Sequence, residues 1–451
     1  MGNKLKSHYL FTNKDLFRLL IPLVIEQFLA VAVGMADSIM IASVGESAVS
    51  AVSLVDSIII LIINVFAALA TGGAVVAGQY IGQRQYDKAK IAGEQLLIFS
   101  AIFSIGIMVI MYIGKGFILN VVFGGIEPDI YAHANTYLLI TFASIPFIAI
   151  YNSGAALFRT MGNSRITMIT SLIMNIINVF GNAFLIYVVK MGVEGVAIPT
   201  LISRMVAAIM IVALLKNEEL IIHISKKFRF KLDRNMVKNI LKIGVPNGIE
   251  NSMFQLGKIL LLSVIAGFGT VSITANAVAN SVTSFQVLPG AAIGLGLITV
   301  ISQCVGANDY EQVRYYTKKL LIIAYISILA MNIVIISLNP YIIKAYNLSL
   351  ETGVLASKVI IFYGICASLI WPLSFTLPNS LRASNDVRYT MIVGVGSMWI
   401  VRIGFGIILS KYLNMGMFGV WVAMIIDWVV RTMFFITRYR GNKWGNKEKL
   451  S

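Results

Sequence analysis

The sequence has little charge and almost no cysteine. Only 12% of its 451 residues are Asp, Glu, Lys or Arg, whereas soluble domains carry about 25%. Hydrophobic residues make up 58% of the chain, and its mean hydropathy is +0.84. This composition excludes an ordinary soluble domain and predicts an all-α polytopic membrane protein. Cys304 and Cys366 both lie in apolar runs, so neither a disulfide framework nor a metal cluster is indicated.

The motifs of most enzymes and pumps are also missing. There is no GxxxxGK[ST] phosphate loop, no HExxH pair, no GxSxG turn and no paired Cys/His spacing. The three histidines, His8, His133 and His223, are scattered in expected surface segments. We therefore expect a protein that is not an enzyme, needs no cofactor and is not an ATP-driven pump. A membrane-embedded transferase would need acids or histidines clustered at one membrane face, and no such cluster can be assembled.

Hydrophobic runs divide the chain into twelve expected spans, and the charges lie between them. A net charge of +16 could suggest nucleic acid, but 27 of the 36 Lys and Arg residues fall in the termini and in the loops after even-numbered spans. By the positive-inside rule both termini are then cytoplasmic, and the partner is the lipid bilayer. The spans are expected at 17–42, 48–80, 93–114, 130–158, 165–189, 193–215, 240–266, 272–305, 317–337, 352–382, 388–410 and 416–438.

The chain repeats itself with a shift of 224 residues. Over positions 22–82 the shift gives fourteen identities in sixty-one residues, among them Pro22 with Pro246 and Glu26 with Glu250. Because each half holds six spans, the repeats run parallel, which predicts two six-helix bundles related by a pseudo-twofold axis, with a binding cavity between or within them. The expected domains are an N-terminal bundle (1–215), a cytoplasmic linker (216–239), a C-terminal bundle (240–438) and a basic cytoplasmic tail (439–451).

The first span carries two carboxylates where charge is costly. Glu26 and Asp37 are eleven residues apart, which on a helix is about 16 Å of rise and ~20° of rotation, so both face one side. That side must face a cavity, a partner helix or a bound cation. Burial away from water favours a protonated or cation-bound carboxyl group, as an antiporter needs. The alternative is an Asp37 that hydrogen-bonds a neighbouring helix and never titrates.

Asparagines in the fifth span could complete an ion site. Asn178 and Asn182 share one helix face at a spacing of four residues, and Asn175 lies within the same two turns. With Asp37 and the Thr200 hydroxyl they form an all-oxygen set suited to Na⁺, or a hydrogen-bond cage for a protonated aspartate. Interhelical amide pairing without transport is the equally open alternative.

Other intramembrane polar residues are expected along the substrate pathway or in structural pairs. Glu26 and Glu250 each follow a proline by four residues, so either acid could face an opening in the helix. Lys258 lies eight residues after Glu250, which leaves an ion pair between them open. The expected pathway residues are Glu26, Asn152, Asn175, Glu250 and Gln255. The expected structural charge cluster is Arg402, Asp427 and Arg431, of which the last two are four residues apart.

The order of several short motifs resembles that of a bacterial MATE (multidrug and toxic compound extrusion) transporter. The motifs are GMADSIMIASVG, AVSAVSL, GGAVVAGQYIG, FRTMGNSR, NIINVFGN, GVEGVAIPTLISR, MWIVRIGFG, GVWVAMIIDWVVR and GNKW. The major facilitator superfamily also has twelve spans, but GQRQYDKA does not match its loop between spans two and three. The resemblance covers almost the whole chain. It implies two six-helix bundles around a central cleft in a bacterial inner or plasma membrane, and an antiporter that exchanges Na⁺ or H⁺ for cationic or amphipathic drugs.

The resemblance also assigns roles to residues. It implies that Asp37 is the coupling carboxylate and that Asn178, Asn182 and Thr200 belong to the same cation site, although some archaeal members have an aspartate where Asn182 stands. The best-known bacterial branch has a glutamate where this chain has Phe254, and an aspartate in span ten that is missing here, so coupling in the C-terminal half is not supported.

We therefore expect a monomeric antiporter working by alternating access. One alternative is a flippase of related architecture for lipid-linked saccharides, which would require a cavity lined with basic residues. The other is a passive channel.

Overall fold

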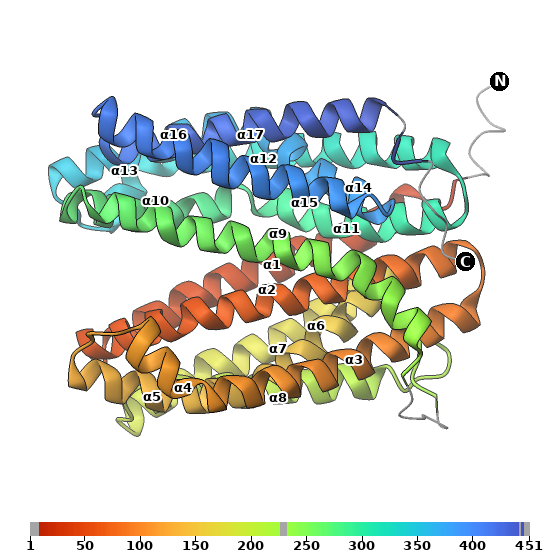
Figure 1. Cartoon of the computed structure of the whole chain (residues 1–451), viewed down its shortest axis with the longest axis horizontal. Coiled ribbons are helices and arrows are strands. Elements are labelled where there is room, and N and C mark those ends of the chain that lie inside the picture. The colour runs from red at the N-terminus through yellow and green to blue at the C-terminus, as the bar shows by residue number, and fades with distance from the viewer. Residues whose placement is uncertain (1–8, 226–231, 442, 446–451) are drawn as a thin grey trace. The chain divides into compact units, whose positions relative to one another are not determined.

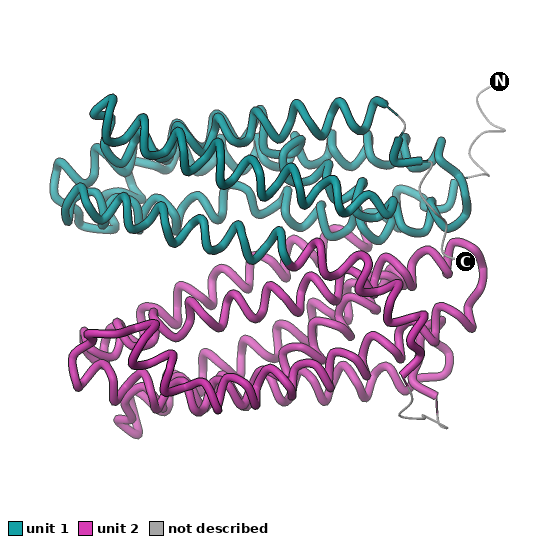
Figure 2. The backbone as a smooth tube through the Cα atoms, viewed as in Figure 1, with its two compact units in different colours: residues 1–16, 249–451 teal, residues 17–248 magenta. Residues whose placement is uncertain are grey.

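The computed structural model describes residues 9–225, 232–441 and 443–445. His8, the centre of the expected linker and most of the expected basic tail lie outside these residues. Within the described part, the chain forms helices joined by short turns (Figure 1). Contacts divide it into two compact units, residues 17–248 and residues 1–16 with 249–451 (Figure 2).

The first unit in chain order, residues 17–248, is built from the helices of the first repeat. Most of these helices are apolar over a length that could cross a bilayer. In α2 the buried side chains include many small residues, which let helices pack closely. A Cβ on Gly72, for example, would lie 2.6 Å from the Ile240 carbonyl oxygen. The helices are α1 (Asn13–Ala42), α2 (Glu46–Gly82), α3 (Tyr86–Ile113), α4 (Lys115–Phe117), the π-helical η1 (Ile118–Val122), α5 (Pro128–Ala143), α6 (Ile145–Thr160), α7 (Ser164–Ala183), η2 (Phe184–Val188) and α8 (Glu194–Leu214).

The second unit holds the helices of the second repeat, and α9 runs from one unit into the other, since the division falls at Gly248 within it. Its core is rich in aromatic residues, including Tyr363, Trp371, Trp421 and Trp428. The helices are α9 (Arg234–Ala266), α10 (Thr270–Gln286), α11 (Leu288–Gly306), α12 (Tyr310–Ala345), α13 (Leu350–Trp371), η3 (Pro372–Thr376), α14 (Leu377–Ala383), α15 (Val387–Gly396), η4 (Ser397–Arg402), α16 (Ile403–Ile407), η5 (Ile408–Tyr412) and α17 (Gly416–Arg440).

The expected number of membrane spans agrees with the helices. Among the described residues, 11 helices are long and apolar enough to cross a membrane, or up to 12 if α5 and α6, bent by 43°, form one span. The span expected at 272–305 is two helices, α10 and α11, because Pro289 stands at the start of α11 where it cannot continue the preceding helix. The all-helical, multi-span fold class is confirmed.

The repeat shifts by one residue where the second unit has an extra π-helical segment. Arg159 and Thr167 recur at Arg382 and Thr390, a shift of 223, whereas residues after η4 return to 224. The first repeat is α-helical over the whole of α7, while the second is π-helical over Ser397–Arg402. A π-helical turn accommodates one additional residue in a helix. This insertion places Arg402 at the position of Asn178.

Candidate functional site

Asp37 of α1 lies within hydrogen-bonding distance of two asparagines of α7. The Asn182 amide donates to Asp37 Oδ1 at 2.7 Å. The hydrogen-bonding pattern orients the Asn178 amide nitrogen toward the carboxylate, where it donates to the two oxygens at 2.9 and 3.2 Å, while its own oxygen accepts from the Thr200 hydroxyl of α8 at 3.0 Å. The structure thus brings together the four residues that the sequence grouped.

This site also contains an oxygen without a hydrogen-bond donor. Asn182 is fully buried, and its Oδ1 has no partner in the described part of the chain. An unsatisfied buried acceptor next to a carboxylate is unfavourable unless a proton or cation joins it. No group of three His, Cys, Asp or Glu side chains that could hold a metal ion is found among the described residues. The site has one carboxylate and one spare neutral oxygen, that of Asn182, which suits a proton or a monovalent cation.

Nearby polar contacts in this unit involve residues that the sequence reasoning missed. The Tyr137 hydroxyl of α5 donates to Asp56 Oδ1 at 3.0 Å, and Arg204 Nη1 of α8 donates to the Ser144 hydroxyl at 2.8 Å. Tyr137 thus gives the Asp56 carboxylate of α2 a hydrogen-bond donor from another helix. Nothing in the spacing of Tyr137 or Ser144 marks them, because their partners come from other helices.

Glu26 is buried and paired with a distant arginine. Arg159 Nη1 of α6 lies 3.1 Å from Glu26 Oε1, and the Thr167 hydroxyl of α7 donates to Oε2 at 2.7 Å. Both carboxylate oxygens are therefore occupied by residues of the same unit. The expectation that Glu26 lines a substrate pathway stays a prediction, and so does that for Asn152 and Asn175, whose side-chain nitrogens lack partners within the described residues.

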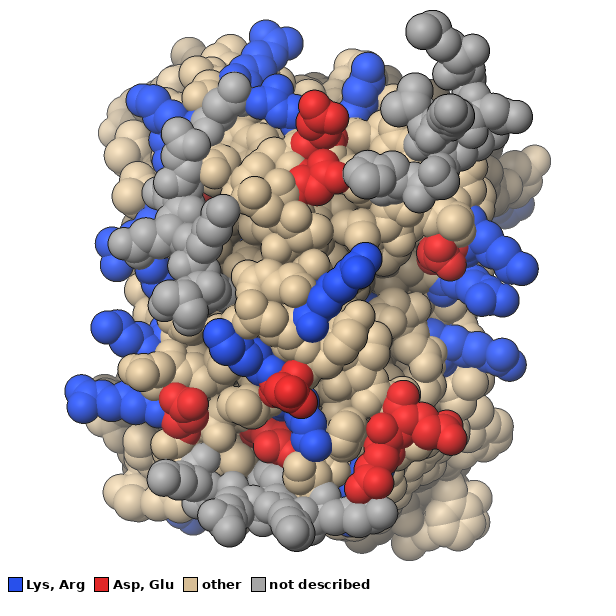
Figure 3. Space-filling model, turned by 90° about the vertical axis from the view of Figure 1, so that its right-hand side faces the viewer, with Lys and Arg blue, Asp and Glu red and all other residues tan. Residues whose placement is uncertain are grey.

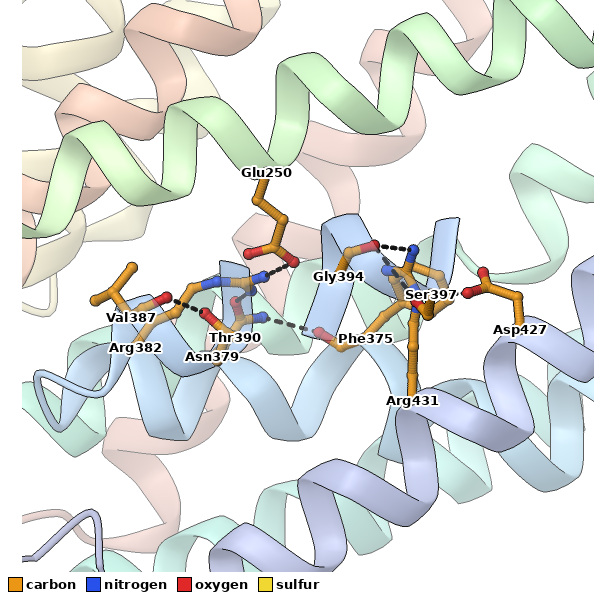
Figure 4. A network of polar contacts seen from close by, with 10 residues as sticks. All are labelled: Glu250, Phe375, Asn379, Arg382, Val387, Thr390, Gly394, Ser397, Asp427 and Arg431. Carbon is orange, nitrogen blue, oxygen red and sulfur yellow. Dashed lines mark hydrogen bonds and ion pairs between the residues drawn. The ribbon is translucent and has the colours of Figure 1, made fainter. Parts of the chain in front are cut away.

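Glu250 repeats this arrangement in the second unit. Its Oε1 lies 2.8 Å from Arg382 Nη2, and Arg382 also donates to Asn379 Oδ1 at 2.6 Å (Figure 4). The possible pairing with Lys258 is therefore corrected, because the repeat equivalent of Arg159 takes that place. Unlike Glu26, Glu250 leaves Oε2 without a partner among the residues described.

The expected pair in α17 is present. Arg431 Nε lies 3.0 Å from Asp427 Oδ1, both side chains are buried, and Arg431 also donates to the Gly394 carbonyl at 3.0 Å (Figure 4). Arg402 lies beside them, since the guanidinium carbons of Arg402 and Arg431 are 5.4 and 5.3 Å from the centre of the Phe254 ring. However, no hydrogen bond or ion pair of Arg402 is found in the described part of the chain.

Arg402 faces a cavity within the second unit. The cavity has a volume of about 290 Å³, and a second one of about 260 Å³ shares Lys258, Asn280, Ser284, Arg402, Trp421 and Met424 with it. Gln255, expected on the substrate pathway, lines the first of them. The molecule thus has two polar sites of different chemistry, an acidic one in the first unit and a basic one in the second.

Comparison with known proteins gives consistent matches over the whole length. A model of the MatE family matches residues 22–184 and again residues 246–408. The chain is 26% identical to an uncharacterized transporter, YisQ, of Bacillus subtilis strain 168, over 96% of this chain and 95% of that protein. It is 24% identical to a probable multidrug resistance protein, NorM, of Thermotoga maritima, over 97% and 94% of the two chains.

Solved structures share the fold. An outward-facing multidrug resistance transporter of the MATE family matches with a TM-score of 0.88 and 22% identity over 96% of this chain and 97% of that chain. A MATE crystal structure in a bent conformation matches with a TM-score of 0.86 and 21% identity over 96% of each chain. At these identities the likeness concerns the fold.

Proposed function

Because the chain belongs to the MatE family of membrane transporters, we propose that it is a secondary antiporter that exports cationic or amphipathic drugs in exchange for Na⁺ or H⁺. The name of the Thermotoga maritima relative, a probable multidrug resistance protein, supports this substrate class. The observation that carries the coupling assignment is the placement of Asp37 against Asn178, Asn182 and Thr200. Such a carboxylate can stay ionised while the amide N–H groups stabilise its charge. It can also bind a proton or Na⁺, with the spare amide oxygen as a further ligand.

Binding of the coupling ion changes which atoms of the two asparagine amides, nitrogen or oxygen, face Asp37. When Asp37 is ionised, the Asn178 and Asn182 amide nitrogens stabilise its charge. When a proton or Na⁺ binds, the amide oxygens of Asn178 and Asn182 become the useful groups, and rotation of the Asn178 amide presents its oxygen. The two hydrogen-bond arrangements join α1 to α7 and α8 differently, so the bound ion favours one packing of the bundle over another.

Export follows if the two packings expose the substrate to opposite sides of the membrane. We place both termini in the cytoplasm of a bacterial cell and treat the protein as a monomer. The orientation is supported by the Lys and Arg residues in the loops after even-numbered spans. Figure 3 shows many Lys and Arg side chains, and fewer Asp and Glu, at one set of helix ends among the described residues.

Proteoliposomes test this proposal. Efflux of a fluorescent organic cation is measured with an imposed pH gradient and, separately, with an imposed sodium gradient. An antiporter moves the cation against its own gradient with one of the two, whereas a passive channel only equilibrates it. If neither gradient drives uphill movement of any organic cation tried, the antiport proposal is wrong.

The flippase is not favoured. A flippase would move lipid-linked saccharides, and no relative compared above is described as one.

A further inference from the structure

The cavity in the second unit is lined by cations and no acid. Lys258 of α9 and Arg402 of η4 both line the two connected cavities, and no Asp or Glu is among the lining residues. Lys258 has no hydrogen bond or ion pair with any residue that the structure describes. The carboxylate of the neighbouring α17 pair, Asp427, is already bound to Arg431. The four charges together sum to +2, which is unfavourable inside a membrane without a counter-charge.

The hydrogen-bonding groups left over around the cavity are donors. The Arg402 side chain is 92% buried, since 8% is exposed, and its Nε–H has no acceptor in the described chain. The indole Nε1–H of Trp428, which lines the second cavity, also has none. Both N–H groups lie beneath the cavity surface, so an anion in the cavity would contact the exposed ammonium of Lys258 and the terminal nitrogens of Arg402.

The remaining wall of the cavity is apolar and aromatic. Trp371, Phe375 and Tyr363 line one part, and Leu261, Leu262 and Ile265 line another. Rings of this kind hold the flat apolar body of a ligand, while a few polar groups fix its orientation. The Arg402 guanidinium over Phe254 is held in place by its cation–π contact and keeps its hydrogen atoms for a planar acceptor.

We propose that this cavity binds an amphipathic aromatic anion, with its carboxylate between Lys258 and Arg402 and its ring against the tryptophans. The acceptor oxygens can come from the carboxylate of such an acid or from the phosphate of an anionic lipid headgroup, whose acyl chains would then contact the apolar wall. The site lies wholly in the second unit. It therefore goes beyond the proposed coupling site and does not depend on it.

Binding of 4-nitrobenzoate to the purified full-length chain tests the proposal, because a nitroaromatic ring quenches the tryptophans that line the cavity. The measurement uses a neutral detergent and a Trp399→Phe background, since Trp399 is 37% exposed and would report probe dissolved in the micelle. We expect saturable quenching by 4-nitrobenzoate and a much weaker effect of uncharged 4-nitrobenzyl alcohol. Equal affinity for both probes would overturn the proposal.

Two variants test whether the positive side chains of Lys258 and Arg402 bind the anion. Lys258→Gln and Arg402→Gln are each expected to weaken binding about tenfold, the usual effect of losing a charge-assisted hydrogen bond. Arg402→Lys should restore part of the affinity. Lys358→Gln is the matched control, because Lys358 lies over the Phe418 ring, away from the cavity, and should bind normally. Should Arg402→Gln fail to fold, Lys258→Gln still decides, because its exposed side chain has no partner to lose.

The same assay identifies the source of the anion and separates this inference from the coupling proposal. In nanodiscs, replacing phosphatidylcholine by phosphatidylglycerol should compete with 4-nitrobenzoate if the natural ligand is a lipid headgroup, and leave binding unchanged if it is a small acid. Asp37→Asn, in the other unit, should not change binding. Normal affinity in both Lys258→Gln and Arg402→Gln would refute the anion site, whatever the transport assays show.

Discussion

The two repeats carry charges of opposite sign in corresponding regions, although not at the same positions. With the 224-residue shift, Leu261 stands where the first repeat has Asp37, Lys258 where it has Gly34, and Arg402 where it has Asn178. All three residues line the basic cavity of the second unit. In contrast, both repeats keep a buried ion pair between equivalent residues, Glu26 with Arg159 in the first and Glu250 with Arg382 in the second.

This contrast separates the framework of the fold from its chemistry. Each unit has a buried Glu–Arg pair that joins distant helices, since a charge left unpaired in a membrane would be very costly. The polar site is free to diverge, because its residues need only suit the ion or ligand they hold. We infer that the first unit handles the cation and the second an anion.

The largest expected effect on transport is loss of coupling in Asp37→Asn. The variant keeps the shape and amide hydrogen bonds of the side chain but cannot take up a proton or carry charge. Uphill efflux in proteoliposomes should fall at least about tenfold, equal to about 1.4 kcal/mol. Leu261→Asn, at the equivalent position of the second unit, is the control and should keep gradient-driven efflux. Full ion-driven efflux in Asp37→Asn would show that the first unit does not hold the coupling carboxylate.

The next effect concerns the buried pair of α17. Asp427→Ala leaves Arg431 without its carboxylate at a site where the two side chains are 0% and 3% exposed. Removing one partner of a buried ion pair costs about 3–5 kcal/mol. The melting temperature of the purified protein in detergent should therefore fall clearly. The double variant Asp427→Ala with Arg431→Met should recover part of the loss, and no recovery would mean that the charge pair is not the cause.

A smaller change should sharpen ion selectivity in the first unit. Asn182→Asp places a second carboxylate beside Asp37, which favours a bound cation over an empty site. We expect sodium-driven efflux to reach half its maximal rate at about tenfold lower sodium, a change of about 1.4 kcal/mol. Asn175→Asp on the same helix is the control for added charge. Unchanged sodium dependence in Asn182→Asp would argue for a proton-only site.

The smallest expected difference lies between the two Glu–Arg pairs. Glu26→Ala breaks contacts at both carboxylate oxygens, while Glu250→Ala breaks a contact at only one. The lost Thr167 hydrogen bond should make the Glu26 variant less stable than the Glu250 variant by about 1 kcal/mol. Denaturation of the two variants in the same detergent measures this difference. A larger loss for Glu250→Ala would show that the pairs are not equivalent supports.

The structure agrees best with the sequence where contacts are local or periodic. Apolar runs predicted the spans, and the four-residue spacing of Asp427 and Arg431 predicted their ion pair. The structure differs from the sequence-based expectation at Glu250. Its partner Arg382 is 132 residues away in the chain, whereas spacing along one helix indicates only the nearer Lys258. The break before α11 is likewise hidden in the hydropathy of the continuous apolar run, although Pro289 at the start of α11 marks it.

By itself, the order of residues determined that this chain crosses a membrane many times, repeats after 224 residues and carries Asp37 in its first helix. These properties follow from hydropathy, periodicity and identity, which need no knowledge of distant contacts. Only the tertiary structure decided which buried charges are paired and which face a cavity: Glu250 pairs with Arg382, and Arg402 lines a cavity beside the Asp427–Arg431 pair. The physical reason is that side-chain pairing across helices depends on their packing, which brings together residues far apart in the chain.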